Sequence, residues 1–310
     1  MMDKKYDVLG MGVVAVDDLI YLDHYPKPDE VLDISRRERQ CGGLTATALV
    51  AASRLGARCA YAGVLGEDTD SEFGIRCLAK EGIDLEHLIR REGARPIRST
   101  ILVDSSKGLR TILCDLHGVV GAGNDHPPEL VIESTKVLFV DNFGLDGMIR
   151  AARIARSKGI PVVADFGVVK DPRFPELLEA IDHLILSLDY ALELTGTATK
   201  EEALESLMSP NREVAVLTDG ANGCWALEAG GAIRQFPSYP VEVVDTTGCG
   251  DVFHGAYAAG LAKGRNLEER IRLASATAAL KATRLGGQAG IPDLATVEGF
   301  LNLRGVETQR

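Results

Sequence analysis

The chain reads Val244-Asp245-Thr246-Thr247-Gly248-Cys249-Gly250-Asp251-Val252-Phe253-His254-Gly255 where a strand predicted over Val241 to Val244 meets a helix predicted over Asp251 to Lys263. Glycine allows a tight turn and lets backbone N–H groups approach a ligand closely. The first amides of a helix lack intrahelical partners and lie at the positive end of its dipole. The stretch therefore predicts an anion-binding loop, with phosphate as the expected ligand.

Three side chains in this stretch each allow two interpretations. Asp251 is either a general base that takes a proton from an attacking hydroxyl or a simple helix cap. His254 lies three residues later on the same helical face, where it either tunes Asp251 or packs against a neighbouring strand. Cys249 is either a small residue of the turn or a reactive thiol, because a helix N-terminus lowers thiol pKa.

The second half of the chain alternates short apolar runs with amphipathic stretches. This alternation predicts a mostly parallel sheet covered by helices on both faces, with ligands at the carboxyl ends of the strands. We expect Asp17, Thr218 and Asp251 at such ends. The runs are Lys136 to Asn142, Met148 to Lys158, Ile160 to Phe166, Leu177 to Ile181, His183 to Leu188, Glu201 to Met208 and Val214 to Thr218.

Two segments alternate apolar and polar residues at period two and do not fit this pattern. They cover Leu19 to Arg39 and Ile97 to Asp115, the second with a turn at residues 105–108. They predict an antiparallel excursion, at about residues 18–40 and 96–116, within a single domain spanning residues 1–310. Its apolar face needs a partner to cover it.

The loop at residues 245–251 resembles the D-T-x-G-A-G-D signature of the ribokinase or PfkB family, with Cys249 at the alanine position. Three other family elements occur in family order. They are a strand from Tyr6 ending at Asp17, the G-G-x-x-x-N element at residues 42–47 with Thr47 at the asparagine position, and the V-T-x-G-x-x-G element at residues 217–223. The resemblance implies a ribokinase-like three-layer α/β sandwich, in which the antiparallel excursion is a lid and often a homodimer interface.

The resemblance also implies roles for individual residues of an ATP-dependent phosphotransferase. Asp251 is the implied base, and the amides of Gly248, Cys249 and Gly250 form the anion hole. Asp17, Gly42, Gly43 and Thr47 are implied to bind the sugar, and Arg110 in the lid either reaches it or is solvated. Thr218, Gly220, Gly223 and Ser187 line the implied ATP site, and Asp245 lies near a monovalent cation, expected to be K⁺.

One family element is absent. Many members carry N-x-x-E near the Mg²⁺ and phosphate site, whereas the corresponding positions here are Ser187 and Tyr190. Mg²⁺ is therefore expected to be held mainly by ATP phosphates and water, which its reluctance to dehydrate allows.

Within the family, the motifs most resemble the fructose-like and sulfofructose kinase group, in part through Gly286-Gly287-Gln288-Ala289-Gly290-Ile291-Pro292. A sulfonate needs cationic partners, but Val31, Cys114 and Phe143 occupy the aligned positions. We therefore expect an uncharged sugar, a ketose such as fructose. A nucleoside is the alternative substrate, with Tyr21, Tyr25 and Leu113 available to contact a base.

Composition argues against several classes of protein, namely nucleic-acid-binding, zinc-binding, dithiol redox, secreted and membrane proteins. The 310 residues are 45% hydrophobic and carry a net charge of −11, which disfavours nucleic acid as a partner. The six cysteines form no C-x-x-C pair, so neither a zinc site nor a redox dithiol is predicted. No apolar run reaches 18 residues and no secretory cleavage site is recognisable, so a cytoplasmic protein without membrane contact is expected.

Two rival functions stay open at this point. Residues 10–15 match the dinucleotide fingerprint G-x-G-x-x-A of NAD-dependent oxidoreductases, which requires a following helix, whereas Val16 to Tyr25 reads as a strand. A non-catalytic sugar- or nucleotide-binding regulator is the other rival. Asp251 argues against it, and the missing N-x-x-E keeps it open.

Overall fold

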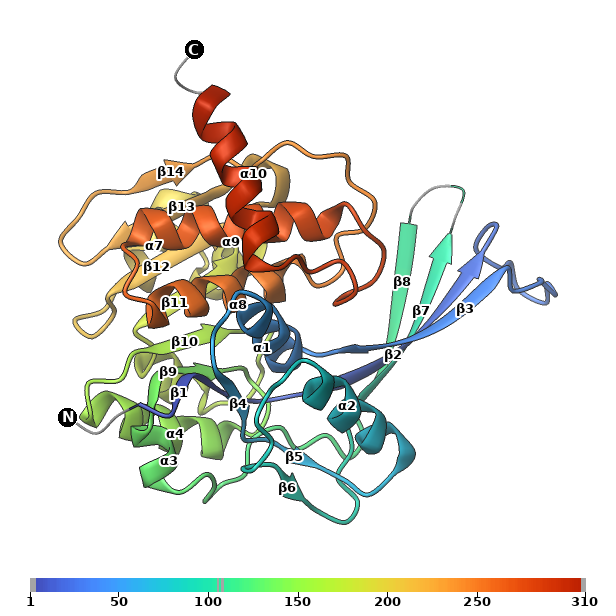
Figure 1. Cartoon of the computed structure of the whole chain (residues 1–310), viewed down its shortest axis with the longest axis horizontal. Helices are drawn as coiled ribbons and strands as arrows, with labels where there is room; N and C mark the ends of the chain where they lie inside the picture. Colours follow the sequence, from blue (N-terminus) through green and yellow to red (C-terminus); the bar gives the residue numbers. More distant parts are fainter. Residues whose placement is uncertain (1–3, 105, 107–108, 308–310) are drawn as a thin grey trace.

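An eight-stranded sheet forms the centre of a computed structural model that describes residues 4–104, 106 and 109–307 (Figure 1). Its order is β14-β13-β12-β11-β10-β9-β1-β4, parallel from β12 to β4 and antiparallel at β13 and β14. The strands are β1 (Tyr6–Met11), β4 (Cys59–Tyr61), β9 (Thr135–Val140), β10 (Val162–Asp165), β11 (His183–Ser187), β12 (Val214–Thr218), β13 (Cys224–Glu228) and β14 (Arg234–Phe236).

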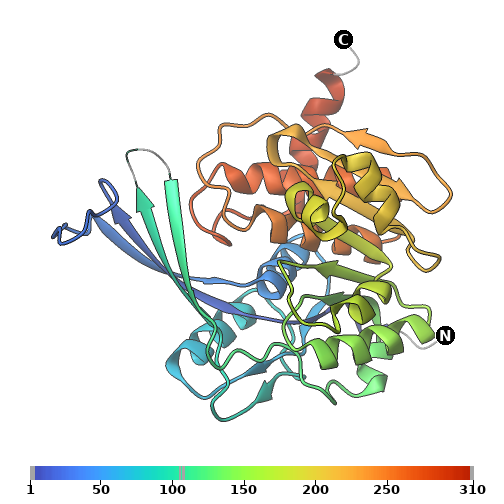
Figure 2. The same cartoon turned by 180° about the vertical axis from the view of Figure 1, so that it is seen from behind.

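Helices cover both faces of this sheet and produce two hydrophobic cores (Figures 1 and 2). One core includes residues of α1 (Leu44–Arg54), α2 (Thr69–Lys80), α8 (Cys249–Ala262), α9 (Leu267–Ala282) and α10 (Leu294–Glu307). The other includes residues of α3 (Glu129–Glu133), α4 (Leu145–Ser157), α5 (Phe174–Glu179), α6 (Leu188–Thr195) and α7 (Lys200–Leu207).

Strand β9 contributes side chains to both cores. Val137 and Phe139 belong to the first core, and Leu138 and Val140 belong to the second. Successive side chains of a strand point to opposite faces, so a continuous apolar run suits a strand covered on both sides. Each such side chain stabilises the fold by about 1.5–3 kcal/mol through burial.

A second, four-stranded sheet extends from the body as the lid (Figure 1). Its order is β3-β2-β7-β8, formed by β2 (Ala15–Leu22), β3 (Arg36–Gly42), β7 (Ile97–Asp104) and β8 (Leu109–Asp115). The two predicted antiparallel pairs are confirmed, and the β2–β7 pairing that joins them is parallel. Of the predicted turn, residues 105, 107 and 108 lie outside the described residues. A short pair, β5 (Val64–Leu65) and β6 (Ile89–Arg90), completes the strands.

The α/β alternation and the lid are confirmed, but two predicted strands are wrong. Val241 to Val244 forms no strand, because Val244 N donates to Ala282 O instead of pairing with a sheet. The strand from Tyr6 to Asp17 is two strands, β1 and β2, so Asp17 lies inside β2 and not at a strand end. Gly12 between them has φ +154°, and a Cβ there would lie 2.0 Å from Asp141 Oδ2.

The N-terminal topology excludes the dinucleotide fingerprint. Strand β2 follows residues 10–15 where a helix is required. Separately, none of the described helices is long and apolar enough to cross a membrane.

Candidate active site

The predicted anion-binding loop lies at the N-terminus of α8. Gly248 precedes the helix with φ +73°, a left-handed conformation that favours glycine. The amide of Cys249 donates to Thr246 O at 3.2 Å, so one of the three predicted anion-hole amides already has a partner. The amides of Gly248 and Gly250 are then the better candidates for binding a phosphoryl oxygen.

Asp245 organises the loop from within. Its Oδ1 accepts hydrogen bonds from Thr247 N and Thr247 Oγ1 at 2.8 and 2.7 Å, and its Oδ2 accepts one from Gly286 N at 2.8 Å. Burial on its own raises the pKa of Asp245, but these hydrogen bonds and the charge of Lys281 outweigh it and hold the pKa below its usual value. Asp245 is therefore an ionised brace between the loop and the segment after α9.

Asp251 lies in the first turn of α8 beside a second carboxyl, that of Asp165 at the end of β10. The two carboxyls share a hydrogen bond, and burial together with the charge of Asp165 raises the pKa of Asp251 well above its usual value. Burial raises the pKa of Asp165 to about 7, with the charge of Asp141 adding to it. Such a pair holds a proton between its members until the pH rises.

Asp165 is a site residue that the sequence prediction missed. The signal was present, because the predicted strand Ile160 to Phe166 contains this acid near its carboxyl end, where ligands bind in parallel sheets.

His254 is buried and packs against the sheet, as the packing interpretation expected. Its ring nitrogens lie 2.7 Å from Gly250 O and 3.0 Å from Ile185 O. Nδ1 also lies 3.4 Å from Asp165 Oδ2. Burial lowers the pKa of His254. The ring therefore fixes the first turn of α8 against β11.

The predicted sugar-binding residues meet where the lid joins the body. A Cβ at Gly42 would lie 2.2 Å from Asp17 Oδ2, so a larger residue at this position would displace the carboxylate. Gly43 caps α1 with φ +99°. Burial raises the pKa of Asp17 to about 6, and the charge of Asp17 in turn contributes to the raised pKa of Asp251. The two acids are therefore close enough for the charge of Asp17 to affect Asp251.

Thr47 does not join this group. Its side chain is fully buried, and its Oγ1 accepts a hydrogen bond from Gln288 Nε2 at 3.1 Å. The position corresponds to the predicted sugar-binding asparagine, but here it links α1 to the segment after α9.

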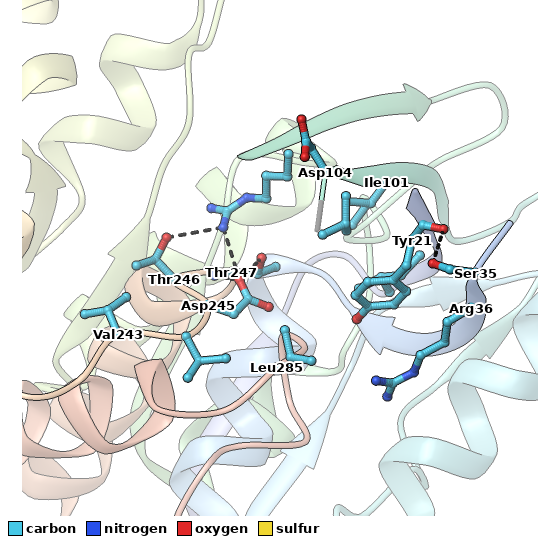
Figure 3. A pocket seen from close by; sticks show the side chains of 14 residues that line it. Tyr21, Ser35, Arg36, Ile101, Asp104, Val243, Asp245, Thr246, Thr247 and Leu285 are labelled. Atoms are coloured by element: carbon cyan, nitrogen blue, oxygen red, sulfur yellow. Dashed lines mark hydrogen bonds and ion pairs between the residues drawn. The ribbon is translucent and has the colours of Figure 1, made fainter. Parts of the chain in front are cut away.

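Arg110 reaches from the lid to the loop. Its Nη1 lies 3.1 Å from Asp245 Oδ1 and 3.2 Å from Thr246 Oγ1. The contact bounds a cavity of about 660 Å³ between the lid and residues 243–247. Tyr21, Arg36, Ile101 and Leu285 also line it (Figure 3). Asp17 and Asp251 are not among its lining residues, so the cavity lies outside the pair of acids.

The predicted nucleotide-binding residues gather at neighbouring strand ends. Ser187 and Thr218 are register partners at the ends of β11 and β12. Gly220 begins a 3₁₀ turn (Gly220–Asn222), and a Cβ at Gly223, which follows with φ +89°, would lie 2.1 Å from Phe236 O. Ser187 caps α6 by accepting a hydrogen bond from Tyr190 N at 3.3 Å.

Cys249 is not activated by its position. Burial raises the pKa of its thiol, which favours the interpretation of Cys249 as a small residue of the turn. Within residues 4–104, 106 and 109–307, no group of three or more His, Cys, Asp or Glu side chains is arranged to hold a metal ion.

Helices α1 and α8 hold the residues predicted to bind sugar close to the loop predicted to bind phosphate. A Cβ at Gly255 would lie 2.0 Å from Ala48 O, so the two helices meet backbone to backbone at this glycine. Gly43 and Gly248, which cap these helices, are therefore parts of one closely packed unit.

Comparison with known proteins agrees with this geometry. The profile of the pfkB family carbohydrate kinases matches residues 12–294. Ribokinase of Haemophilus influenzae is 28% identical, with 94% of this chain and 96% of that protein covered. The crystal structure of a putative ribokinase from Agrobacterium tumefaciens has a TM-score of 0.89 at 28% identity, covering 96% of this chain and 97% of that one. Arabidopsis thaliana ribokinase complexed with ribose and ATP has a TM-score of 0.83 at 22% identity, with 95% and 98% coverage.

Proposed function

The chain belongs to the pfkB family of carbohydrate kinases and is a phosphotransferase, and from that premise we propose that it transfers the γ-phosphoryl group of ATP to a terminal hydroxyl of a small uncharged sugar. The observation that carries the proposal is the placement of Asp251, beside the helix-terminal amides and close enough to Asp17 to be affected by its charge. In this proposal Asp251 is the base, the amides of the 248–250 loop form the anion site and Asp17 binds a sugar hydroxyl. These three groups are the ones that phosphoryl transfer to a hydroxyl requires.

In the proposed reaction, Asp17 and the backbone at Gly42 and Gly43 hold the sugar. Asp251 accepts the proton of the attacking hydroxyl, and the amides of the 248–250 loop stabilise the charge on the transferring group. Phosphoryl transfer depends chiefly on positioning and charge stabilisation, so the loop matters at least as much as the base.

ATP is proposed to lie along Thr218, Gly220 and Gly223, with Ser187 beside them. Mg²⁺ neutralises charge on the phosphates when bound. Because Ser187 and Tyr190 offer no carboxylate at the N-x-x-E positions, we propose that ATP oxygens and water hold the metal.

The sugar is proposed to be fructose or a sugar of similar size, with ribose tested beside it because two of the relatives above are named ribokinases. A nucleoside is the second candidate, because Tyr21 and apolar lid side chains line the 660 Å³ cavity. Leu113 does not support it, since that side chain does not line this cavity.

The lid also supports a proposed homodimer. Strand β8 is a sheet edge, and Leu109, Ile112 and Leu113 are each about half exposed on it. Apolar side chains on an open edge suit pairing with a second copy. Sedimentation of the wild type and of an Ile112→Lys variant would test this. We place the enzyme in the cytoplasm, where free thiols persist.

The decisive experiment is ADP release measured with Mg-ATP over a panel of ketoses, aldoses, sugar acids and nucleosides. Turnover on fructose or ribose supports the sugar assignment, and turnover on nucleosides alone replaces it with the second candidate. Absence of turnover on the whole panel, with ATP binding retained, favours the non-catalytic regulator.

A further inference from the structure

One lysine is fully buried beside the phosphate-binding loop and has no role in the mechanism above. Lys281 lies in the last turn of α9 with an exposed fraction of 0%. Its Nζ donates to the main-chain oxygen of Asp245 at 2.9 Å. A buried ammonium is costly unless it is compensated by partners. Packing alone therefore does not explain why Lys281 is buried at this position.

Burial, and to a lesser degree the charge of Arg110, lowers the pKa of Lys281, and several features around the ammonium act against this shift. The carboxylate of Asp245 and the C-terminal end of the α9 dipole both favour a cation there. The same region holds the carboxyl of Asp251, which also favours the charged lysine. The ammonium thus lies where the electrostatic field of the loop attracts a cation.

Asp245 is the residue that the family resemblance associates with a monovalent cation, and donors of this chain, two of them cationic, already contact its oxygens. Its Oδ1 is taken by Thr247 and Arg110, and its Oδ2 by Gly286 N. Its main-chain oxygen accepts from Lys281. Each oxygen of Asp245 that could coordinate K⁺ is already bound by a hydrogen-bond donor.

We infer that the Lys281 ammonium takes the place of the monovalent cation, so that this enzyme needs no K⁺. Lys281 is a positioning residue, because it acts through Asp245 on the loop that carries Gly248 and Gly250. The inference rests on the proposed function where it is tested by kcat, because that measurement requires the kinase reaction.

The first test uses the wild-type protein in KCl, NaCl and choline chloride at one ionic strength. We expect kcat and Tm to agree among the three salts. A severalfold rise in kcat, or a rise in Tm, specific to K⁺ would overturn the inference. If the wild type phosphorylates nothing on the panel, the proposed function fails, while the Tm series still decides the cation question.

The second test removes the Lys281 ammonium by mutation and supplies a cation from solution in its place. Lys281→Ala keeps Cβ, so n-propylammonium matches the missing atoms from Cγ to Nζ. In choline we expect kcat to fall at least ~10-fold, because the anion-hole loop loses its brace. K⁺ or n-propylammonium should restore activity and raise Tm, as expected for a ligand that binds the folded state.

Controls separate charge from folding. Lys80→Ala removes an exposed lysine of α2 and should change neither salt response nor kcat. Lys281→Met fills the space without charge and should respond less to K⁺ than Lys281→Ala. A folded, ATP-binding Lys281→Ala protein that keeps wild-type kcat in choline, or that neither cation rescues, would contradict the inference.

Discussion

Arg110 Nη1 lies 3.1 Å from Asp245 Oδ1, so a lid strand is tied to the loop whose amides we propose to bind phosphate. The two residues are 135 positions apart in the chain. Arg110 is partly exposed, so the pair contributes at most about 1 kcal/mol to folding. The main effect of the pair is to hold the lid in position over the cavity.

Replacing Arg110 by Met should therefore weaken sugar binding more than folding. We expect KM for the sugar to rise roughly 3- to 10-fold, because the lid is no longer held over the site. Tm should change by about 2 °C or less. Arg37→Met, at an exposed position of β3, is the matched control. Equal KM values in the two variants would show that the Arg110 contact does not aid binding.

Asp251→Asn tests the proposed base. Removing a general base typically costs on the order of 10² to 10⁴ in rate, so kcat should fall by that factor while ATP affinity stays near normal. Glu268→Gln neutralises an exposed acid in the first turn of α9 and should leave kcat unchanged. Near-normal turnover in Asp251→Asn would reject the role.

Asp17→Asn tests the sugar site with a control on the adjacent residue. Losing a hydrogen bond to a charged group costs about 1.5–3 kcal/mol, which corresponds to a roughly 10- to 150-fold rise in KM for the sugar. KM for ATP should not change. Asp18 lies on the opposite face of β2, where it pairs with Arg39, so Asp18→Asn should leave both KM values unaltered. The role fails if the two variants behave alike.

Asp165 makes the stability of the protein depend on pH. An unfolded Asp ionises near pH 4, whereas the pKa of Asp165 in the folded protein is raised to about 7. The folded state thus binds the proton more tightly, and this contribution to stability is present below pH 4 and lost as the pH rises through 7.

Asp165→Asn removes the part of this dependence that comes from Asp165. We expect its Tm to exceed that of the wild type at pH 8 by a few degrees, at about 2 °C per kcal/mol, and by less at pH 5. Thermal melts at both pH values measure the difference, with Asp189→Asn as a control for loss of an exposed acid. A Tm gain that is larger at pH 5 than at pH 8 would contradict the assignment.

Thiol reactivity should distinguish Cys77 from Cys249. A hydrogen bond with Cys41 lowers the pKa of Cys77 to about 7, whereas burial raises the pKa of Cys249. The thiolate is the reactive form, so iodoacetamide at pH 7.5 should alkylate Cys77 before Cys249. Mass spectrometry of timed samples gives the order. Faster labelling of Cys249 would show that the helix N-terminus, and not burial, controls its thiol.

Local patterns predicted the sheet, the lid and the loop before α8, because glycine spacing and hydrophobic period are properties of nearby residues. The errors came from tertiary context. Val243 and Val244 have the composition of a strand, but their neighbours in space are the lid cavity and Ala282. The pairing of Asp165 with Asp251 and of Lys281 with Asp245 depends on side chains from separate elements, which one sequence does not bring together.

The backbone contact between Gly255 and Ala48 fixes the packing of α1 against α8, whereas the side chains of the lid are free of this constraint. Because α1 and α8 meet without intervening side chains, the body of the protein sets the distance between their capping glycines, Gly43 and Gly248. The lid side chains that line the cavity lie outside this contact. New sugar preferences are therefore best sought by substitutions at lid positions such as Tyr21, Arg36 and Ile101, which should alter selection of the acceptor and leave the transfer geometry intact.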